Sequence, residues 1–179
     1  ADDGAPDGMY RLSPEGEPFV LYVPDGWVDN NSSGVVSAYY SSIDNITVSA
    51  SYFAHENASI TLSEYVDELT VAYAEGLGVY LTARKAAVLG GADAIELTYT
   101  SKMDDKEFIY REVIARNGDL FVMLRFHCPS ARYEELEEEL DNMIAAFELT
   151  APGEIKNDCV TDKNTPEGMK IASNDKIEY

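Results

Sequence analysis

The sequence predicts an α+β fold in which an antiparallel β-sheet lies between two α-helices, an α/β/α sandwich. Three observations predict it: extended runs joined by hairpin-type turns, two segments with helical periodicity, and strands that are apolar on both faces. The chain has 179 residues, of which 45% are hydrophobic, so a single domain of ordinary size can bury a core without a metal or a lattice of disulfides.

The first strands are short. Residues 9–12 and 18–23 form a predicted hairpin around the turn at 14–17, and proline and an Asp-Gly pair end it at Pro24–Trp27. A second extended pair covers 34–41 and 45–54, with its turn at Asp44-Asn45.

The period changes from 2 to 3.6 at a predicted capping box, Thr61-Leu62-Ser63-Glu64. The Thr61 hydroxyl can accept the Glu64 amide while the Glu64 carboxylate reaches back. A helix follows, with Gly76 and Gly78 at its C-terminal cap. Its apolar stripe is Leu62, Tyr65, Val66, Leu69, Ala72 and Tyr73.

Four further extended runs form a predicted antiparallel meander. They cover residues 79–89, 92–102, 107–116 and 119–128. Their connections are Gly90-Gly91, Met103-Asp104-Asp105, and Asn117-Gly118, an Asn-Gly pair suited to a type I′ turn. The last run alternates apolar residues on one face with Phe121 and Met123 on the other, before Arg125 and His127 become polar.

The second helix begins after Ser130, its predicted N-cap, and carries Glu134 and Glu135 near the positive end of its dipole. Its apolar stripe is Leu136, Leu140, Met143, Ile144 and Phe147. The opposite face is Glu135, Glu138, Glu139 and Asp141. No calcium-loop motif accompanies these acids, so we interpret them as a solvated face.

The charge excludes some partners. There are 33 acidic and 13 basic residues, a net charge of −20, and the basic residues are scattered, which argues against nucleic acid and anionic membranes. No apolar run is long enough to span a membrane. The two cysteines form no C-x-x-C pair and His55 lies far from His127, so neither a zinc site nor any cofactor is predicted.

Four segments carry a resemblance to a known family: Phe19–Trp27, Ser63-Glu64-Tyr65, Gly90–Ala94 and Ile144–Phe147. With the order of elements, they resemble the PsbP-like family across most of residues 9–149. The resemblance implies an exported, membrane-anchored accessory or binding domain. The metal-binding histidines proposed for some photosynthetic relatives have no clustered counterparts here, so no metal site is carried over.

The C-terminal segment repeats the N-terminal one. Residues 165–179 align with 5–19 at a constant offset of 160, with identities at Pro166, Gly168, Met169 and Ser173. This predicts a tandem array: a tether at 1–8, one domain at 9–149, a linker at 150–164, and the start of a second copy at 165–179. The repeat would place a tryptophan near position 187.

Three aromatic residues are candidate contacts for a ligand or partner. Trp27 follows a turn and could stack on a sugar, although a place at one end of the core is the alternative. Tyr39 and Tyr40 are adjacent on a strand, so one of them points outward, either as a contact or as a side chain that covers the sheet.

Catalytic residues are not predicted. The chain has no Gly-x-Ser-x-Gly motif, and His127 and Cys128 point to opposite faces of a strand. We expect a non-enzymatic, extracellular binding or accessory domain on the cell surface, held to the membrane only through a lipid anchor outside this sequence, with a protein or cell-wall ligand as its partner. The alternatives are a carboxylate-dependent hydrolase or lyase, and a cell-envelope spacer.

A disulfide between Cys128 and Cys159 is predicted. The helix after Cys128 runs about 25 Å, and the residues that follow it can retrace that length if extended. An exported protein would form this bridge, which would hold the linker against the domain and contribute about 3 kcal/mol.

Overall fold

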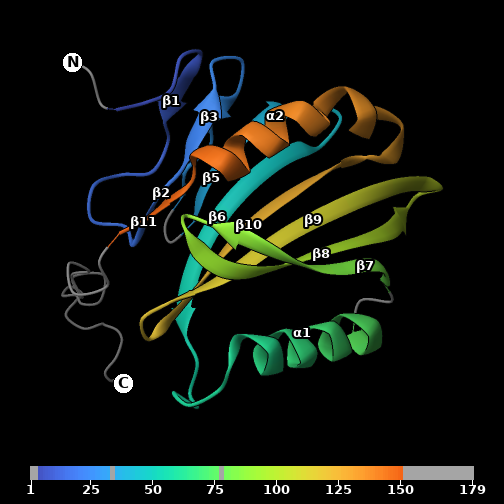
Figure 1. The fold of residues 1–179 in the computed structure, drawn as a ribbon. Helices are drawn as coiled ribbons and strands as arrows, with labels where there is room; N and C mark the ends of the chain where they lie inside the picture. Colours follow the sequence, from blue (N-terminus) through green and yellow to red (C-terminus); the bar gives the residue numbers. More distant parts are fainter. Residues whose placement is uncertain (1–3, 33–34, 77–78, 151–179) are drawn as a thin grey trace, which may run out of the picture.

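The computed structural model describes residues 4–32, 35–76 and 79–150 (Figure 1). A seven-stranded antiparallel sheet forms the centre, in the order β4-β5-β6-β10-β9-β8-β7. Its strands are β4 (Val28–Asp29), β5 (Val36–Ser41), β6 (Ile46–Ala54), β7 (Tyr80–Leu89), β8 (Ala92–Met103), β9 (Lys106–Asn117) and β10 (Leu120–Pro129).

Two small sheets lie beside it. β1 (Met9–Arg11) pairs with β3 (Tyr22–Pro24), as the N-terminal hairpin predicted, and β2 (Phe19–Val20) pairs with β11 (Glu148–Leu149). The second pairing brings the chain after the last helix back to the N-terminal segment. Thr150 donates its amide to the Pro18 carbonyl at 3.1 Å, which extends this contact by one residue.

The two helices cover opposite faces of the sheet, α1 (Leu62–Gly76) below and α2 (Tyr133–Ala146) above in Figure 1. The α/β/α layering predicted from the sequence is therefore confirmed. No helix among the described residues is long and apolar enough to cross a membrane.

The core has two parts, one on each face. On the α2 face, Leu136, Leu140 and Met143 pack against alternate strand residues such as Val122 and Leu124. The smaller part, on the α1 face, is formed by Ile60, Val66, Leu97, Tyr99, Ile114 and Phe121. The apolar residues of β10 on one face of the sheet are thus covered by α2, and Phe121 on the other face is covered by α1. Within α1, Val66 is the buried residue, whereas Ala72 of the predicted stripe is exposed.

Two local predictions are wrong. The β9–β10 turn is centred on Gly118 and Asp119, because Asn117 pairs with Leu120, and only Gly118 has a positive φ (65°), as at the first central position of a type II′ turn. Ser130 does not cap α2: a 3₁₀ turn (Ser130–Arg132) comes first, and neither helical segment has a side-chain cap.

The start of α1 is as predicted in one respect. The Thr61 hydroxyl accepts the Glu64 amide at 3.1 Å. This bond satisfies one of the amides that a helix leaves unpaired at its first turn, and so fixes where α1 begins.

Candidate functional site

A buried carboxylate organises the α1 face. Glu112 on β9 has no solvent exposure and accepts hydrogen bonds from Tyr99 (2.5 Å) and Tyr73 (2.9 Å). Arg125 on β10 donates its Nε to the same carboxylate at 2.5 Å, and its Nη2 to the Tyr73 hydroxyl at 2.9 Å. This network fastens α1 to the sheet through Tyr73.

The two tyrosines act as donors throughout the normal pH range. Burial raises the pKa of Tyr99 and of Tyr73 well above the usual value, and the nearby Glu112 carboxylate raises both further. The network is therefore one negative charge and one positive charge held by two neutral hydroxyls. Such an arrangement supports structure, since neither tyrosine releases a proton near neutral pH.

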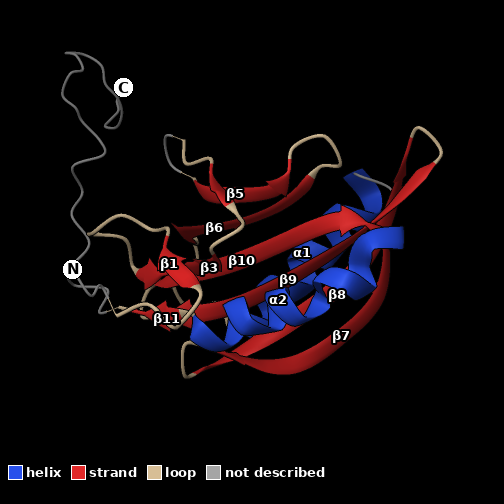
Figure 2. Cartoon of the chain, turned by 90° about the horizontal axis from the view of Figure 1, so that it is seen from above, coloured by secondary structure: helices blue, strands red, loops and turns tan. Residues whose placement is uncertain are grey.

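The rest of this face is open beside α1. The helix packs on β7, β8 and β9, and leaves much of β5, β6 and β10 without a covering layer in the described chain (Figures 1 and 2). We call this surface the open face. It consists of Tyr39, Thr47, Ser49, Ser51, Met123, Arg125 and His127.

The open face has its own chemistry. Although the chain carries 33 acidic residues, none of these seven side chains is acidic, and four of them carry hydroxyls. The Arg125 side chain is 41% exposed. Its Nη1 is the guanidinium nitrogen that no described residue binds, and Ser49 is its register partner on β6. The described contacts therefore leave one nitrogen of a partly exposed guanidinium without a partner.

His127 is held neutral. Its Nε2 lies 3.0 Å from the Asn45 side-chain oxygen and so donates to it. Burial, helped by the neighbouring Arg125 guanidinium, lowers the His127 pKa to about 4. Its ring lies 5.2 Å from that of Tyr110, which stacks at 5.0 Å on Tyr99. The result is an uncharged aromatic row that borders Arg125.

The structure places the predicted contact residues in different surroundings. Trp27 is only 2% exposed and donates its indole nitrogen to Glu139 of α2 at 2.7 Å, which corresponds to the core alternative and removes it from any ligand surface. Tyr40 packs beside Trp27 and is 40% exposed. Tyr39 faces the other side, on the open face. The other residues of the open face were not predicted as contacts. The one sequence signal for them was the change from apolar residues to Arg125 and His127 on one face of β10.

The predicted disulfide remains a prediction. Cys128 lies fully buried on β10, where burial raises the pKa of its thiol to about 11. Cys159 lies outside the described residues, as do most of the predicted linker and the whole predicted repeat at 165–179.

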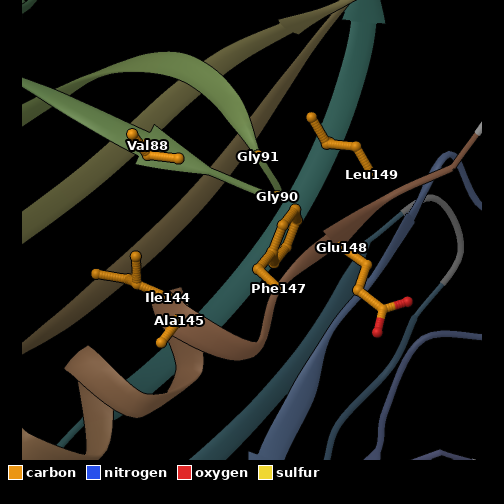
Figure 3. Close-up of a pocket in the computed structure, with 8 residues that line it drawn as sticks. All are labelled: Val88, Gly90, Gly91, Ile144, Ala145, Phe147, Glu148 and Leu149. Carbon is orange, nitrogen blue, oxygen red and sulfur yellow. The ribbon is translucent and has the colours of Figure 1, made fainter.

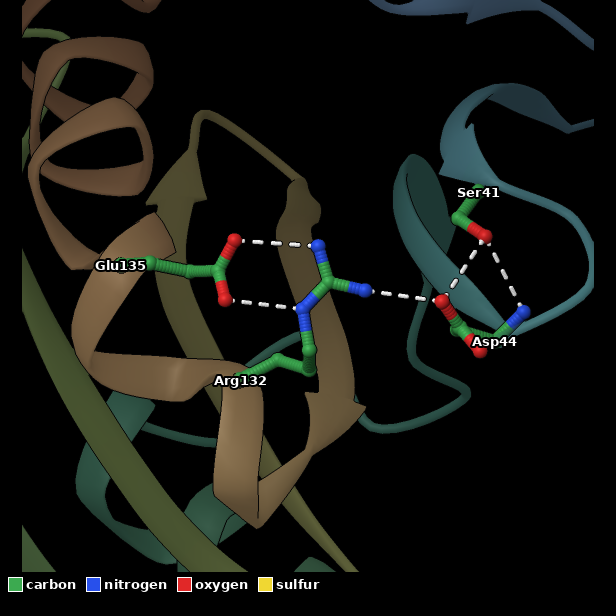
Figure 4. Close-up of polar contacts among 4 residues, drawn as sticks. All are labelled: Ser41, Asp44, Arg132 and Glu135. Atoms are coloured by element: carbon green, nitrogen blue, oxygen red, sulfur yellow. Dashed lines mark hydrogen bonds and ion pairs between the residues drawn. The ribbon is translucent and has the colours of Figure 1, made fainter.

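A second arginine joins two segments on the surface (Figure 4). Arg132, before α2, binds Glu135 through two nitrogens at 2.8 and 3.0 Å and Asp44 through the third at 2.8 Å. Asp44 in turn contacts Ser41. All three guanidinium nitrogens are engaged, so we assign this cluster to connecting the β5–β6 turn with α2. Three of the four acids on the predicted solvated face of α2 are thus paired: Glu135 here, Glu139 with Trp27, and Asp141 with Arg111 at 3.3 Å.

Two cavities lie at the ends of α2 in the described chain. One of about 540 Å³ lies between the β7–β8 hairpin and the end of α2 (Figure 3). Another, of about 470 Å³, adjoins the Arg132 cluster and includes Ser130, whose buried hydroxyl has no hydrogen-bond partner in the described chain. No group of three or more histidine, cysteine, aspartate or glutamate side chains suited to a metal occurs within residues 4–32, 35–76 and 79–150.

Comparison with solved structures identifies the fold as PsbP-like. Cyanobacterial PsbP (CyanoP) from Synechocystis sp. PCC 6803 matches with a TM-score of 0.58 and 16% identity, over 82% of this chain and 95% of that one. LpqN, described as involved in cell envelope biogenesis of Mycobacterium tuberculosis, matches with a TM-score of 0.55 and 18% identity, over 79% and 90%.

A third structure is longer. A protein from Bacteroides thetaiotaomicron VPI-5482 matches with a TM-score of 0.56 and 18% identity, over 82% of this chain but only 49% of that one. No protein-family model matches the sequence, and no curated protein matches it either. At identities of 16–18%, the similarity to these structures establishes the fold alone.

Proposed function

We propose that this chain is an exported, non-enzymatic binding domain that takes a carboxylate-bearing glycan of the cell envelope on its open face. The observation that carries the proposal is the half-exposed Arg125, with one nitrogen that no described residue binds, among seven side chains that include no acid in a chain of charge −20. Hydroxyls can bond to sugar hydroxyls, aromatic rings can pack on sugar rings, and the guanidinium recognises a carboxylate.

The proposal that the chain is exported rests on what is known of proteins with the same fold. Among the matched structures, LpqN is described as involved in cell envelope biogenesis. We extend this to an extracellular, lipid-anchored location for this chain, with a tandem second copy beyond the linker. The Bacteroides protein, which this chain covers to 49%, supports the view that this fold can form part of a longer protein. Two linked weak sites would gain avidity.

The proposal of a non-catalytic role rests on where the buried acids lie. Glu96 and Glu112 are the two buried carboxylates among the described residues. They face opposite sides of the sheet, Glu96 bound to Arg111 and Glu112 to Arg125. A glycosidase needs two carboxyl groups on either side of one bond, so this pair cannot serve the hydrolase alternative. The spacer alternative predicts no ligand at all.

The experiment is binding to an array of oligosaccharides with and without carboxylates. We expect the carboxylated members to bind, and Ser49→Glu to abolish binding, because a glutamate opposite Arg125 would occupy the nitrogen that the ligand needs. Ser42→Glu, on the exposed β5–β6 turn, is the matched control and should bind as the wild type does. Equal binding of Ser49→Glu, or turnover of any array member, would overturn the proposal.

A further inference from the structure

The central sheet has one long edge that no strand of the described residues covers. At one side it ends in β4, which has two residues, whereas at the other it ends in β7, which has ten. No described segment pairs with the outer side of β7, and Figure 2 shows it as the outermost strand. An unpaired edge of this length presents backbone groups that can bind another strand.

The hairpin after β7 fixes which backbone groups point outward. Gly90 and Gly91 both have positive φ, and Leu89 pairs directly with Ala92, so this is a two-residue hairpin whose flanking pair is hydrogen-bonded. Hydrogen-bonded and non-hydrogen-bonded pairs alternate from there. Val88, Ala86 and Arg84 therefore direct their N–H and C=O groups away from β8.

A cavity whose lining side chains are mostly apolar lies at the end of this edge. It is the cavity of about 540 Å³ in Figure 3, lined by Val88, Gly90, Gly91, Ile144, Ala145, Phe147, Glu148 and Leu149. Val88 is 61% exposed. In Figure 3 the Glu148 carboxylate, the one charged group among the lining side chains, points away from Val88 and Gly90.

A lysine stands beside the same edge. Lys85 is exposed and forms no ion pair with a described residue, whereas its neighbour Arg84 is bound to Asp67 of α1 at 2.6 Å. Lys85 pairs with Glu96, and Leu89 with Ala92, so both lie on the α2 face, four residues apart. That spacing corresponds to about 13 Å along a strand.

We propose that β7 binds an extended segment of a partner protein as an eighth strand of the sheet. The segment hydrogen-bonds to Arg84, Ala86 and Val88, places an apolar side chain in the cavity, and sets a carboxylate beside Lys85. Its own apolar and acidic residues are therefore four positions apart. Main-chain bonds supply affinity in this mode of recognition, and the two side chains supply specificity.

Charge argues against a second copy of this chain as the occupant. An antiparallel β7–β7 pairing near the centre of the strand would set Arg84 opposite Arg84, or Lys85 opposite Lys85, of the second copy, and like charges in register are destabilising. The irregularity between Leu81 and Ala83 further disturbs a continuous self-pairing. An acidic segment meets neither obstacle.

The test uses the full chain, immobilised, and a display library of random ten-residue peptides as the probe. We expect enrichment of peptides with an apolar and an acidic residue four positions apart. Two variants then locate the site. Lys85→Glu reverses the charge, and Ala86→Pro removes an outward N–H without touching the β7–β8 ladder. Lys102→Glu, on the exposed end of β8, is the matched control.

Each selected peptide should bind Lys85→Glu and Ala86→Pro at least tenfold more weakly, and Lys102→Glu as tightly as the wild type. Circular dichroism checks that each variant is folded. If Ala86→Pro does not fold, the binding of Lys85→Glu, which changes only a surface side chain, tests the proposal. Absence of enriched peptides, or unchanged binding to Lys85→Glu, would overturn the proposal. So would a dimer in sedimentation that Ala86→Pro dissociates, because a second copy would then be the occupant.

Discussion

Replacing Glu112 by glutamine tests the network that joins α1 to the sheet. The carboxylate accepts three hydrogen bonds, from Tyr99, Tyr73 and Arg125, and has no exposure to water. Each hydrogen bond to a charged group contributes about 1.5–3 kcal/mol, and an amide has one acceptor oxygen instead of two. Breaking a buried ion pair costs about 3–5 kcal/mol.

We expect the lower end of that range, a loss of about 3 kcal/mol in the free energy of unfolding, because water can solvate the half-exposed Arg125. Urea denaturation followed by circular dichroism measures it. Glu107→Gln, at an exposed position on the same strand, is the control and should change stability by no more than about 0.5 kcal/mol. Hydrogen exchange should accelerate first in α1, which the network anchors.

The reasoning is refuted if Glu112→Gln loses less than about 1 kcal/mol. A double-mutant cycle with Tyr99→Phe adds a second criterion. The two changes share one hydrogen bond, so their effects should be less than additive. Strict additivity would mean that the short Tyr99–Glu112 contact contributes nothing.

Three further predictions concern other parts of the domain. The His127 pKa is lowered to about 4, below its usual 6.5, so the neutral ring stabilises the fold above pH 6.5 and this contribution is lost as the pH falls toward 4. Urea titrations of the wild type should show a loss of about 2–3 kcal/mol in the free energy of unfolding over this range, and a smaller loss in His127→Gln. The same pH profile in both proteins would contradict the prediction. Gly90→Ala should cost about 2 kcal/mol more than Gly91→Ala in thermal unfolding, since both have positive φ but only a Cβ at Gly90 would meet Leu149, at 2.8 Å; equal costs would contradict the close approach. Thiol titration of the denatured, unreduced protein should find no free thiol if Cys128 and Cys159 are bridged, and two per chain would refute the bridge.

The fold was predictable because its signals are local. Period-2 runs of ten residues, glycine turns and two amphipathic stripes fix the meander and the helices. β4 and β11 were not predicted, since two residues cannot show a period, and their pairing depends on the distant partners Tyr39 and Val20. The Ser130 cap failed because a 3₁₀ turn precedes α2.

The candidate site was predictable only in part. The sequence shows that Arg125 and His127 share one parity of β10, but which half of that face stays open depends on where α1 packs. That position depends on the apolar packing of Val66 and on the hydrogen bond from Tyr73 to Glu112, whose sequence context gives no sign of burial. Trp27 was weighed as a contact or a core residue, and its hydrogen bond to Glu139, 112 residues away, could not be deduced from the chain.

An NMR titration of the ¹⁵N-labelled chain with a galacturonic acid oligosaccharide tests the central claim most directly. The account predicts saturable shifts of amides at Tyr39, Thr47, Ser49, Arg125 and His127, which are absent with the neutral galactose oligosaccharide and absent in Ser49→Glu. Saturable shifts confined to any other surface, or equal shifts with the neutral sugar, would contradict the claim that Arg125 on the open face recognises a carboxylate.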